Sequence, residues 1–474
     1  MLYMDFFLGG KWVSSEDKLQ VIHPYTNEPV GAVSKASALD AKEAIEIAYE
    51  AQEEVSSLTS FERYEILMRA SSLLKSRAEE FERMLVLEAG KTIKEARTEV
   101  SRAIQTLIFS AEEAKRIGGE VFPVDAHPNG RGKFGFYIRE PAGVVVAITP
   151  FNFPLNLSLH KLAPAFAAGN PVILKPSEKT PITPLMLAEL LLEAGFPPKA
   201  LSVLPGDAEV GKALTKSELV RVVSFTGSKK IGEMISSQVG IKRLVLELGS
   251  NSALIIHKDA NLKKALKSAV LGSYAIAGQV CISIQRLLVH EEIYGEFSQM
   301  LKKAIKELKI GDPMSESTDV GPVISLSEKA RILDWIESAK SEGAKILQGG
   351  ESLEGCLISP ALIADVSQNS PLVREEAFAP LVVMMPYKDP DEAISIVNSS
   401  SYGLQTGIFT NDLSLAWHFI KNIKCGGVLI NESPSFRADH MPYGGYKMSG
   451  IGREGPRFAI QDYTEIKTVI FDLS

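Results

Sequence analysis

The sequence predicts an α/β protein built on parallel sheets, and three observations support this fold class. From residue 143 onward, short apolar runs alternate with helical segments, a pattern typical of parallel strands covered on both faces. Between about residues 40 and 118, apolar residues recur three and four positions apart, which indicates amphipathic helices on one core. The 474 residues, 45% of them hydrophobic, are enough for more than one core.

Two series of strands and helices follow one another along the chain. The first series predicts a helix at 181–194 and strands at 143–149, 171–175, 201–204, 221–225 and 243–248. The second begins after Asn251, with strands at 287–290, 381–385, 406–409 and 427–431 and helices at 261–277, 293–308, 328–342 and 391–398. Because each series can form its own sheet, we expect two α/β domains.

Residues 122–140 predict a β-hairpin that belongs to neither series. The segment is rich in proline, glycine and charge, and Asn129-Gly130 is a strong two-residue signal for a hairpin turn. Because the hairpin has no evident place in either sheet, it is a candidate arm for oligomer formation.

Composition and charge exclude several classes of protein and site. The net charge is −7 and the pI about 5.7, so no nucleic-acid partner is expected. Cys281, Cys356 and Cys425 form no CxxC or Cys/His cluster, and the seven histidines lack metal-ligand spacing, so neither a disulfide framework nor a metal site is expected. No stretch predicts an export signal or a membrane span, so we expect a cytoplasmic protein.

Two strings match the dinucleotide fingerprint G-x-G-x-x-G, at residues 130–135 and 450–455. The first string follows no predicted strand and opens no predicted helix, and the second leaves too little chain for a βαβ unit. Both are therefore interpreted as loops.

A stronger nucleotide-binding signal lies where predicted strands end. Asn152 follows the first strand, Lys175 and Glu178 follow the second, and Gly227 and Ser228 join a further strand to a helix. Ligands of doubly wound sheets bind beyond the carboxyl ends of the strands, where an acid can accept from a ribose hydroxyl. The N–H groups that begin a helix can bind a pyrophosphate.

Two residues carry a chemical signal. Cys281 follows Gly278, which ends the predicted helix 261–277, so the thiol is expected on a turn that a substrate can reach. Glu247 lies inside the apolar run 243–248, where a buried acid is costly without a partner or a function. Taken alone, a single cysteine is more often a small core residue, and Glu247 fits a salt-bridged or edge glutamate equally well.

Seven motifs, taken together and in order, resemble the aldehyde dehydrogenase superfamily. They are Pro150-Phe-Asn152-Phe-Pro154, Lys175-Pro-Ser-Glu178, Phe225-Thr-Gly-Ser228, Leu246-Glu247-Leu-Gly249, Gly278-Gln-Val-Cys281, Glu376-Ala-Phe378-Ala-Pro380 and Pro442-Tyr-Gly-Gly-Tyr-Lys-Met-Ser-Gly450. The resemblance is nearest to the branch of small hydroxyaldehyde enzymes such as lactaldehyde dehydrogenases, through residues 278–283 and 434–442.

The resemblance implies a Rossmann-type cofactor domain, an α/β catalytic domain and a small β oligomerisation element. Residues 1–121 and 141–250 would form the NAD(P)-binding domain, and residues 251–440 the catalytic domain. Residues 122–140 and 460–474 would form the oligomerisation arm of a homodimer or homotetramer, and residues 441–459 would return to the cofactor domain.

The resemblance also assigns roles by motif position. Cys281 would be the nucleophile, Glu247 the general base, and the Asn152 amide with the Cys281 backbone N–H the oxyanion hole. Lys175 and Glu178 would bind the adenosine ribose. The further cofactor contacts would be Gly227 and Ser228 at the pyrophosphate, Glu376 and Phe378 at the nicotinamide, and Ile148, Pro150, Phe151, Ser177, Gly211, Phe225, Leu248 and Gly249 around them. The sequence departs from the family pattern at Ser250-Asn251 and Ala379, beside cofactor-lining turns.

The implied activity is oxidation of an aldehyde to the acid through a Cys281 thiohemiacetal and a thioester. Glu178 favours NAD, because a carboxylate accepts from a free 2′-hydroxyl and repels a 2′-phosphate, although Lys175 could tolerate NADP. The expected substrate is a small hydroxyaldehyde such as lactaldehyde. Arg437 is expected at the substrate mouth as a contact for a polar or anionic tail, the alternative being an exposed arginine paired with Asp439.

Other activities stay open. Non-phosphorylating glyceraldehyde-3-phosphate, sulfolactaldehyde and succinic semialdehyde dehydrogenases are alternatives, and a CoA-acylating enzyme would pass the thioester to coenzyme A. A non-catalytic relative would be expected to lack Cys281, Glu247 or Asn152, and all three are present. A cysteine hydrolase would need a histidine beside Cys281, which the sequence does not predict.

Overall fold

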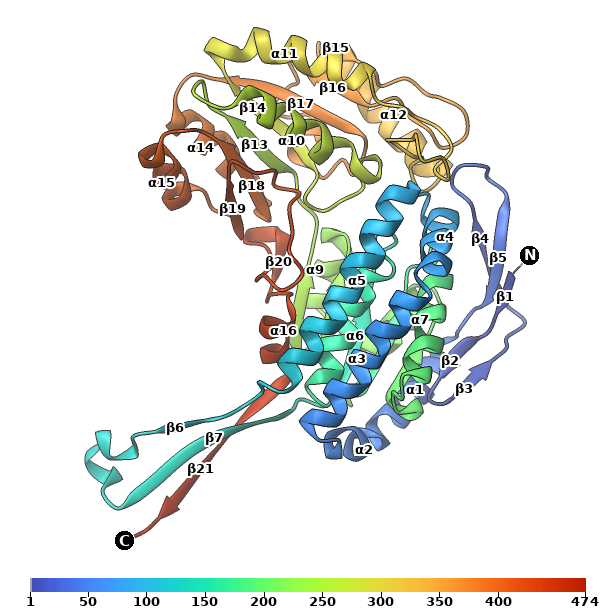
Figure 1. Ribbon diagram of the computed structural model, residues 1–474, viewed down its shortest axis with the longest axis vertical. Coiled ribbons are helices and arrows are strands. Elements are labelled where there is room, and N and C mark those ends of the chain that lie inside the picture. Colours follow the sequence, from blue (N-terminus) through green and yellow to red (C-terminus); the bar gives the residue numbers. More distant parts are fainter. Residues whose placement is uncertain (1) are drawn as a thin grey trace.

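Two large sheets form the centres of two lobes in the computed structural model, which describes residues 2–474 (Figure 1). An arm built of strands extends from the lower lobe and carries the C-terminus (Figure 1). Both sheets are mainly parallel and covered by helices, which confirms the predicted α/β class.

The first sheet has eight strands, in the order β20-β12-β11-β8-β9-β10-β2-β3. The five central strands run parallel, whereas β20, β2 and β3 are antiparallel additions at the two edges. The strands are β2 (Phe6–Leu8), β3 (Lys11–Val13), β8 (Val144–Ile148), β9 (Val172–Lys175), β10 (Leu201–Val203), β11 (Val220–Thr226), β12 (Arg243–Glu247) and β20 (Gly450–Ile451).

Helices cover this sheet in layers, and α6 forms the innermost one. Every residue of α6 is buried, because it packs on β8 and β9 on one side and on α3 and α5 on the other. The helices of this lobe are α1 (Ala38–Glu50), α2 (Gln52–Ser57), α3 (Ser60–Ser76), α4 (Ala78–Ala89), α5 (Ile93–Ala114), α6 (Asn156–Ala167), α7 (Ile182–Glu193), α8 (Ala208–Lys216), α9 (Lys229–Ser236) and α16 (Pro456–Asp462).

The second sheet has seven strands, in the order β15-β16-β17-β14-β13-β18-β19, and only β15 is antiparallel. Its strands are β13 (Ser252–Ile256), β14 (Ile284–His290), β15 (Lys345–Gln348), β16 (Ala361–Ala364), β17 (Leu381–Tyr387), β18 (Gln405–Phe409) and β19 (Gly427–Ile430). Its helices are α10 (Leu262–Tyr274), α11 (Glu291–Lys306), α12 (Leu326–Ser341), α13 (Pro371–Arg374), α14 (Pro390–Asn398) and α15 (Leu413–Asn422).

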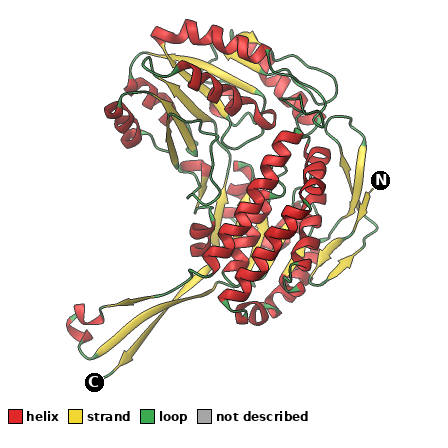
Figure 2. Cartoon of the chain, viewed as in Figure 1, coloured by secondary structure: helices red, strands yellow, loops and turns green. Residues whose placement is uncertain are grey.

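Two three-stranded sheets complete the fold. One lies near the N-terminus and contains β1 (Leu2–Met4), β4 (Lys18–Ile22) and β5 (Pro29–Ser34). The other is the arm, with β6 (Glu120–Phe122), β7 (Lys133–Pro141) and β21 (Thr464–Asp472). Strands β7 and β21 pair antiparallel along their whole length, so the arm joins two segments far apart in the sequence (Figure 2).

The hairpin turn predicted at Asn129-Gly130 is wrong. Two 3₁₀ turns, η1 (Val124–Ala126) and η2 (Pro128–Gly130), connect β6 to β7 instead. The His127 ring accepts from the N–H of Asn129, and Pro128 begins η2, so local capping replaces the tight turn. Strand β7 then starts three residues after Gly130.

Other elements also differ from the prediction. The predicted helix 261–277 ends at Tyr274, and a separate turn η4 (Ala275–Gly278) follows it. Strands β13, β15 and β16 and the N-terminal strands were not predicted. The second glycine string enters β20, which pairs antiparallel with β12, so it is not a dinucleotide fingerprint.

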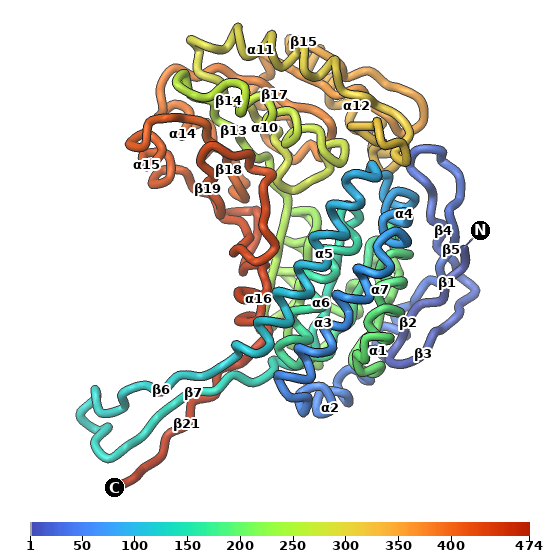
Figure 3. The backbone as a smooth tube through the Cα atoms, in the orientation of Figure 1, coloured from blue at the N-terminus to red at the C-terminus, as the bar shows by residue number. Residues whose placement is uncertain are grey.

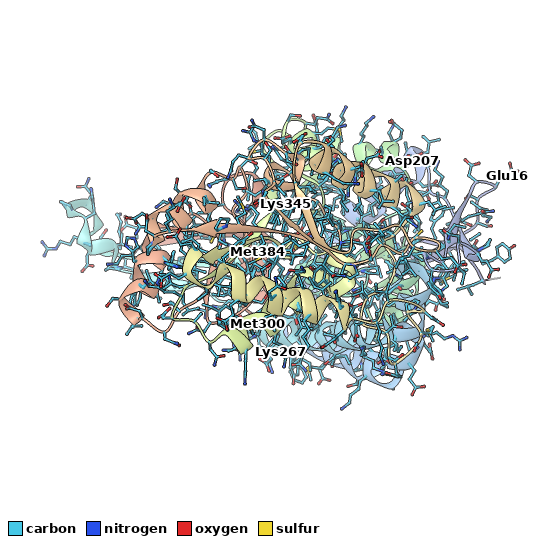
Figure 4. The ribbon with its side chains drawn as sticks, turned by 90° about the horizontal axis from the view of Figure 1, so that it is seen from above. Glu16, Asp207, Lys267, Met300, Lys345 and Met384 are labelled. Atoms are coloured by element: carbon cyan, nitrogen blue, oxygen red, sulfur yellow. The ribbon has the colours of Figure 1, made fainter. Side chains whose placement is uncertain are left out.

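The chain crosses between the lobes twice within the segments that carry the site motifs. It passes from β12 to β13 near residue 250, and returns from β19 to β20 near its end (Figure 3). Seen from above, Asp207 lies toward Glu16, which is in the bend between β3 and β4, and away from Met384 on β17 (Figure 4).

Within residues 2–474, no helix is both long and apolar enough to cross a membrane. The same residues contain no group of three or more His, Cys, Asp or Glu arranged to bind a metal.

Candidate active site

A cavity of about 960 Å³ brings most of the predicted site residues together from both lobes. The predicted residues that line it are Pro150, Phe151, Asn152, Gly227, Ser228, Glu247, Leu248, Gly249, Cys281, Glu376 and Phe378. Sequence reasoning did not assign the other lining residues, Leu157, Thr226, Lys229, Lys230, Glu233, Glu328, Arg331, Trp335, Glu375 and Tyr402.

A left-handed turn presents Cys281 to this cavity. Ile276, Ala277 and Gly278 have φ values of 53°, 52° and 70°, a run of left-handed residues that side chains other than glycine rarely adopt. A Cβ atom at Gly278 would overlap the carbonyl oxygen of Ala379, so this position requires glycine. The turn is the reason that the thiol leaves the helix axis and is partly exposed.

The Asn152 amide is fixed beside the cysteine by two elements. Glu99 on α5 accepts from the N–H groups of Leu155 and Asn156, both at 3.0 Å, which anchors the loop between β8 and α6. Asn152 Nδ2 donates to the carbonyl of Gln279 at 2.8 Å. Because an amide nitrogen carries two hydrogens, the second remains for a group bound next to Cys281.

Glu247 ends β12 with its carboxyl group buried. Its backbone carbonyl accepts from Gly227 N–H at 3.1 Å, and Oε1 has no hydrogen-bond partner among residues 2–474. Burial, and then the nearby Glu454 carboxylate, raise the pKa of Glu247 to about 8 against the opposing positive charge of Arg437. The group therefore titrates close to neutral pH, as a general base requires.

The Cys281 thiol experiences opposing influences. Burial raises the pKa of Cys281 well above its usual value, and the negative charge of Glu247 adds to this. The hydroxyl of Tyr443, 2.9 Å from the sulfur, and the positive charge of Arg437 lower the pKa of the same thiol. Sequence reasoning quoted Tyr443 within a motif but gave it no role.

At the other end of the cavity, Glu376 and Phe378 approach the loop after β12. Glu376 accepts from Ser250 N–H at 3.0 Å, and burial raises the pKa of Glu376 to about 7. A Cβ atom at Gly249 would overlap the Glu376 carboxyl group, so glycine permits this close approach. The rings of Phe151 and Phe378 meet edge to face with centroids 5.8 Å apart.

Ser250 and Asn251, where the sequence departs from the family pattern, lie in the loop after β12 and form hydrogen bonds to neighbouring segments. Ser250 supplies the N–H that holds Glu376. Asn251 donates to the carbonyl of Val373 at 2.8 Å and accepts from the Ser400 hydroxyl at 2.7 Å. Both residues therefore fasten the junction between the lobes.

The six remaining predicted cofactor residues lie outside the cavity lining. Four of them are neighbours: Ile148 pairs with Lys175 and Phe225 across the sheet, and Gly211 faces the Lys175 side chain. Burial lowers the pKa of Lys175, and the Glu178 carboxylate opposes this. Ser177 and Glu178 follow in the turn after β9.

Arg437 is not an exposed arginine paired with Asp439, so that alternative is wrong. Its side chain is only 6% exposed and donates to Glu454 at 2.9 Å. The guanidinium lies 3.8 Å from the centre of the Tyr443 ring, and the buried Asp439 carboxylate pairs with Arg102 and His160 instead. Arg437 thus lies against Tyr443 and is not among the residues that line the cavity.

A buried group of charged side chains, Lys161, Glu454 and Arg437, lies next to the site and was not predicted from the sequence. Lys161 on α6 donates to Glu454 at 2.9 Å, and both side chains are almost inaccessible. Arg437 and Lys161 keep the pKa of Glu454 far below its usual value, although burial alone would raise it. The available signal was the pair His160-Lys161 inside the apolar helix that follows Asn152.

The residues that line the cavity fit a dinucleotide. The N-terminus of α9, capped by Ser228, opens into it, which suits a pyrophosphate, and glycines at 227 and 249 keep the approach open. Beyond the ends of the parallel strands, the same cavity also contains a thiol, a side-chain amide and a buried acid, from Cys281, Asn152 and Glu247. Residues 12–469 match the sequence model of the aldehyde dehydrogenase family, and the chain belongs to that family of aldehyde-oxidising oxidoreductases.

Curated relatives match over nearly the whole chain. The 3-sulfolactaldehyde dehydrogenase of Priestia aryabhattai is 46% identical over 468 residues, which cover 98% of each chain. The lactaldehyde dehydrogenase of Methanocaldococcus jannaschii is 41% identical over 469 residues, covering 98% of this chain and 99% of the relative.

Solved structures share the fold. Aldehyde dehydrogenase 21 of Physcomitrella patens, in complex with its product succinate, has a TM-score of 0.96 at 39% identity and covers 99% of this chain and 98% of its own. The glyceraldehyde-3-phosphate dehydrogenase GapN of Methanocaldococcus jannaschii, complexed with NADP, has a TM-score of 0.93 at 40% identity, with 97% and 100% covered. Betaine aldehyde dehydrogenase of Staphylococcus aureus, with NAD⁺, has a TM-score of 0.96 at 32% identity, with 99% and 95% covered.

Proposed function

We propose that the protein oxidises a small hydroxyaldehyde to its carboxylic acid with a nicotinamide dinucleotide as oxidant. The observation that carries this proposal is that Cys281, Glu247 and Asn152 line one cavity with the residues expected at the nicotinamide. The lactaldehyde and sulfolactaldehyde enzymes among the relatives support the substrate class.

Each group has a chemical task in this proposal. The Cys281 thiolate attacks the aldehyde carbon, so an S–C bond forms and the carbonyl electrons move to oxygen. The free N–H of Asn152 and the Cys281 backbone N–H stabilise that oxyanion. The bound dinucleotide supplies the hydride acceptor.

Glu247 then completes the reaction. A thioester remains on Cys281 after oxidation, and Glu247 removes a proton from the water that attacks it. Its buried carboxyl oxygen, which has no partner within the described part of the chain, is free to accept that proton. The acid leaves and the thiolate is restored.

The proposed cofactor is NAD, with NADP as a weaker second. Glu178 and Asp207 both act electrostatically on Lys175, so two carboxylates lie near the strand end expected to bind the ribose. Negative charges there favour a free 2′-hydroxyl over a 2′-phosphate. Preference for NADP by tenfold or more would overturn this part of the proposal.

Arg437 is proposed to bind an anionic tail of the substrate. Its Nε is buried without a partner among the described residues, and so is Nδ1 of His160, whose other nitrogen lies 3.2 Å from Arg437 Nη2. Unpartnered buried polar atoms beside a reactive group are ready to bind a polar ligand.

We further propose that residues 1–121 with 141–250 bind the cofactor, that residues 251–440 carry the nucleophile, and that the arm supports a homodimer or homotetramer.

The test is NADH and NADPH formation by purified protein with a panel of aldehydes. The panel contains lactaldehyde, glyceraldehyde, 3-sulfolactaldehyde, glyceraldehyde-3-phosphate, succinic semialdehyde and propanal. Cys281→Ala is expected to abolish activity, while Cys425→Ala, at a buried cysteine in the bend before β19, retains it. Activity that survives Cys281→Ala would overturn the proposal.

A second candidate function is oxidation of glyceraldehyde-3-phosphate, which the GapN neighbour favours. The panel separates the two by the ranking of phosphorylated and neutral substrates. An acyl-CoA product in place of the free acid would show that the thioester goes to coenzyme A instead of water.

A further inference from the structure

We propose that Tyr443 is a catalytic residue whose hydroxyl donates a hydrogen bond to the Cys281 thiolate and then to the 2-hydroxyl of the bound substrate. The inference deepens the proposed function and rests on it for the substrate step. None of the roles assigned above uses this hydroxyl, although its oxygen lies 2.9 Å from the sulfur.

The Tyr443 ring is held in a fixed position. Its backbone exchanges two hydrogen bonds with Glu454, at 3.1 and 2.7 Å, and its side chain is 1% exposed. Ile282 and Leu404 pack in the same small apolar cluster, and Arg437 stacks on the ring with its guanidinium 3.8 Å from the ring centre. The hydroxyl therefore contacts the sulfur from a ring that is already fixed in place, and the Tyr443 side chain needs no rearrangement.

The direction of the hydrogen bond follows from the two proton affinities. Burial and the nearby negative groups raise the pKa of Tyr443 well above its usual value, so the phenol keeps its proton. A thiolate has no proton to donate and accepts only. Once Cys281 is ionised, Tyr443 must be the donor, and a charge-assisted bond of this kind stabilises the anion.

The hydrogen bond from Tyr443 counteracts surroundings that disfavour the ionised Cys281. Burial and Glu247 both disfavour the Cys281 thiolate, and Tyr443 is the neutral donor that contacts the sulfur directly. Arg437 on the ring adds positive charge and makes the hydroxyl a stronger donor. Arg437 is thus a positioning residue for Tyr443 in addition to its proposed contact with the substrate tail.

The partner of the hydroxyl changes when the S–C bond forms. The sulfur then shares its electron pair with carbon and carries no charge, so it becomes a weak acceptor. In a 2-hydroxyaldehyde the hydroxyl oxygen is on the carbon next to the one bonded to sulfur, within reach of a group that contacts sulfur. Tyr443 can then donate to that oxygen, which would favour 2-hydroxyaldehydes over simple alkanals.

The first test measures the thiolate without any substrate. The rate of Cys281 alkylation by iodoacetamide is measured from pH 6 to 10 in the wild type, in Tyr443→Phe and in Tyr387→Phe. Tyr387 is a matched control, because it is buried and hydrogen-bonded but pairs with His290 at the far end of β14. We expect Tyr443→Phe to be alkylated about tenfold more slowly than the wild type wherever the rate still rises with pH, which corresponds to a thiol pKa about one unit higher, and the control to match the wild type. An unchanged rate profile in Tyr443→Phe would overturn the proposal.

The second test compares lactaldehyde with propanal, which differ only in the 2-hydroxyl. Tyr443→Phe is expected to lower kcat/KM for both, because both need the thiolate, and to reduce the lactaldehyde-to-propanal ratio by about tenfold. A ratio within twofold of the wild type would overturn the substrate step. If the wild type oxidises neither aldehyde, the proposed function fails, whereas the alkylation profile still decides the role of Tyr443 at the sulfur.

Discussion

The carboxylate of Glu95 accepts the backbone N–H of Ile276 at 2.6 Å, so the start of α5 is tied to the left-handed turn that presents Cys281. Its other oxygen accepts from Thr92 N–H at 2.9 Å in the capping box of the same helix. One side chain thus begins a helix in the first lobe and holds the turn before the nucleophile in the second.

We predict that Glu95→Ala lowers kcat by about tenfold or more, because the left-handed turn loses its external hydrogen bond and Cys281 moves. Glu95→Gln keeps an oxygen acceptor and is expected to retain most of the activity. Steady-state kinetics and iodoacetamide alkylation measure the two effects. Thr92→Ala is the control, since it weakens the same cap and leaves the bond to Ile276 intact; equal losses in Thr92→Ala and Glu95→Ala would contradict the prediction.

The general base gives a pH prediction. With a pKa of about 8, Glu247 is largely protonated at pH 6, and its ionised fraction rises about tenfold from pH 6 to 7 and levels off above 8. Hydrolysis of the thioester is expected to follow that fraction. In Glu247→Gln, a rapid burst of NADH should persist while turnover is lost, which stopped-flow absorbance would show. Steady turnover in Glu247→Gln would assign the base elsewhere.

The same shift has a consequence for stability. Glu247 has a higher pKa in the folded protein than in the unfolded chain, so its protonated form stabilises the fold. This stabilisation is complete at pH values below the unfolded-state pKa and is lost as the pH rises through 8. The melting temperature of the wild type should therefore fall more steeply between pH 6.5 and 9 than that of Glu247→Gln. Parallel pH profiles in differential scanning fluorimetry would contradict this.

Local signals in the sequence account for much of the fold. Capping boxes at Ser37, Thr59 and Thr92 mark the first turns of α1, α3 and α5, and apolar runs mark the central strands of both sheets. Strand β13 was missed because Ser252–Ile256 is short and buried on both faces. A continuous apolar run of this length has no period that separates a strand from a helix.

Part of the site could likewise be predicted from the sequence, and part depends on tertiary contacts. Motif positions bring Cys281, Glu247 and Asn152 to one cavity, whereas the contact between Cys281 and Tyr443 joins residues 162 positions apart, and Tyr443 itself is paired with Glu454 further along the chain. The burial of Arg437 could not be predicted for a related reason. Its partner Glu454 and the ring of Tyr443 become neighbours only when the C-terminal segment returns to the first lobe.

Cofactor preference should respond to Glu178. We predict that Glu178→Gln improves kcat/KM with NADP and lowers the NAD-to-NADP ratio by about five- to tenfold, since one negative charge near the expected 2′ position is removed. Lys175→Ala should weaken both cofactors. Glu79→Gln, an exposed charge on α4, serves as the control for net charge. If the NAD-to-NADP ratio of kcat/KM were unchanged in Glu178→Gln, the adenosine ribose would not bind at the end of β9.

Two glycines offer a matched test of the turn before the nucleophile. Gly278 has φ of 70° and no room for a Cβ atom beside the Ala379 carbonyl, so Gly278→Ala must move the backbone next to Cys281. We predict a lower melting temperature and a loss of most activity. Gly295 lies inside α11 with nothing within 4 Å of a Cβ atom, so Gly295→Ala should stabilise the protein by about 1 kcal/mol through helix propensity and leave kinetics unchanged. If Gly278→Ala kept its kcat while its melting temperature fell, the turn would serve folding alone, and the left-handed backbone would not be what aims the thiol.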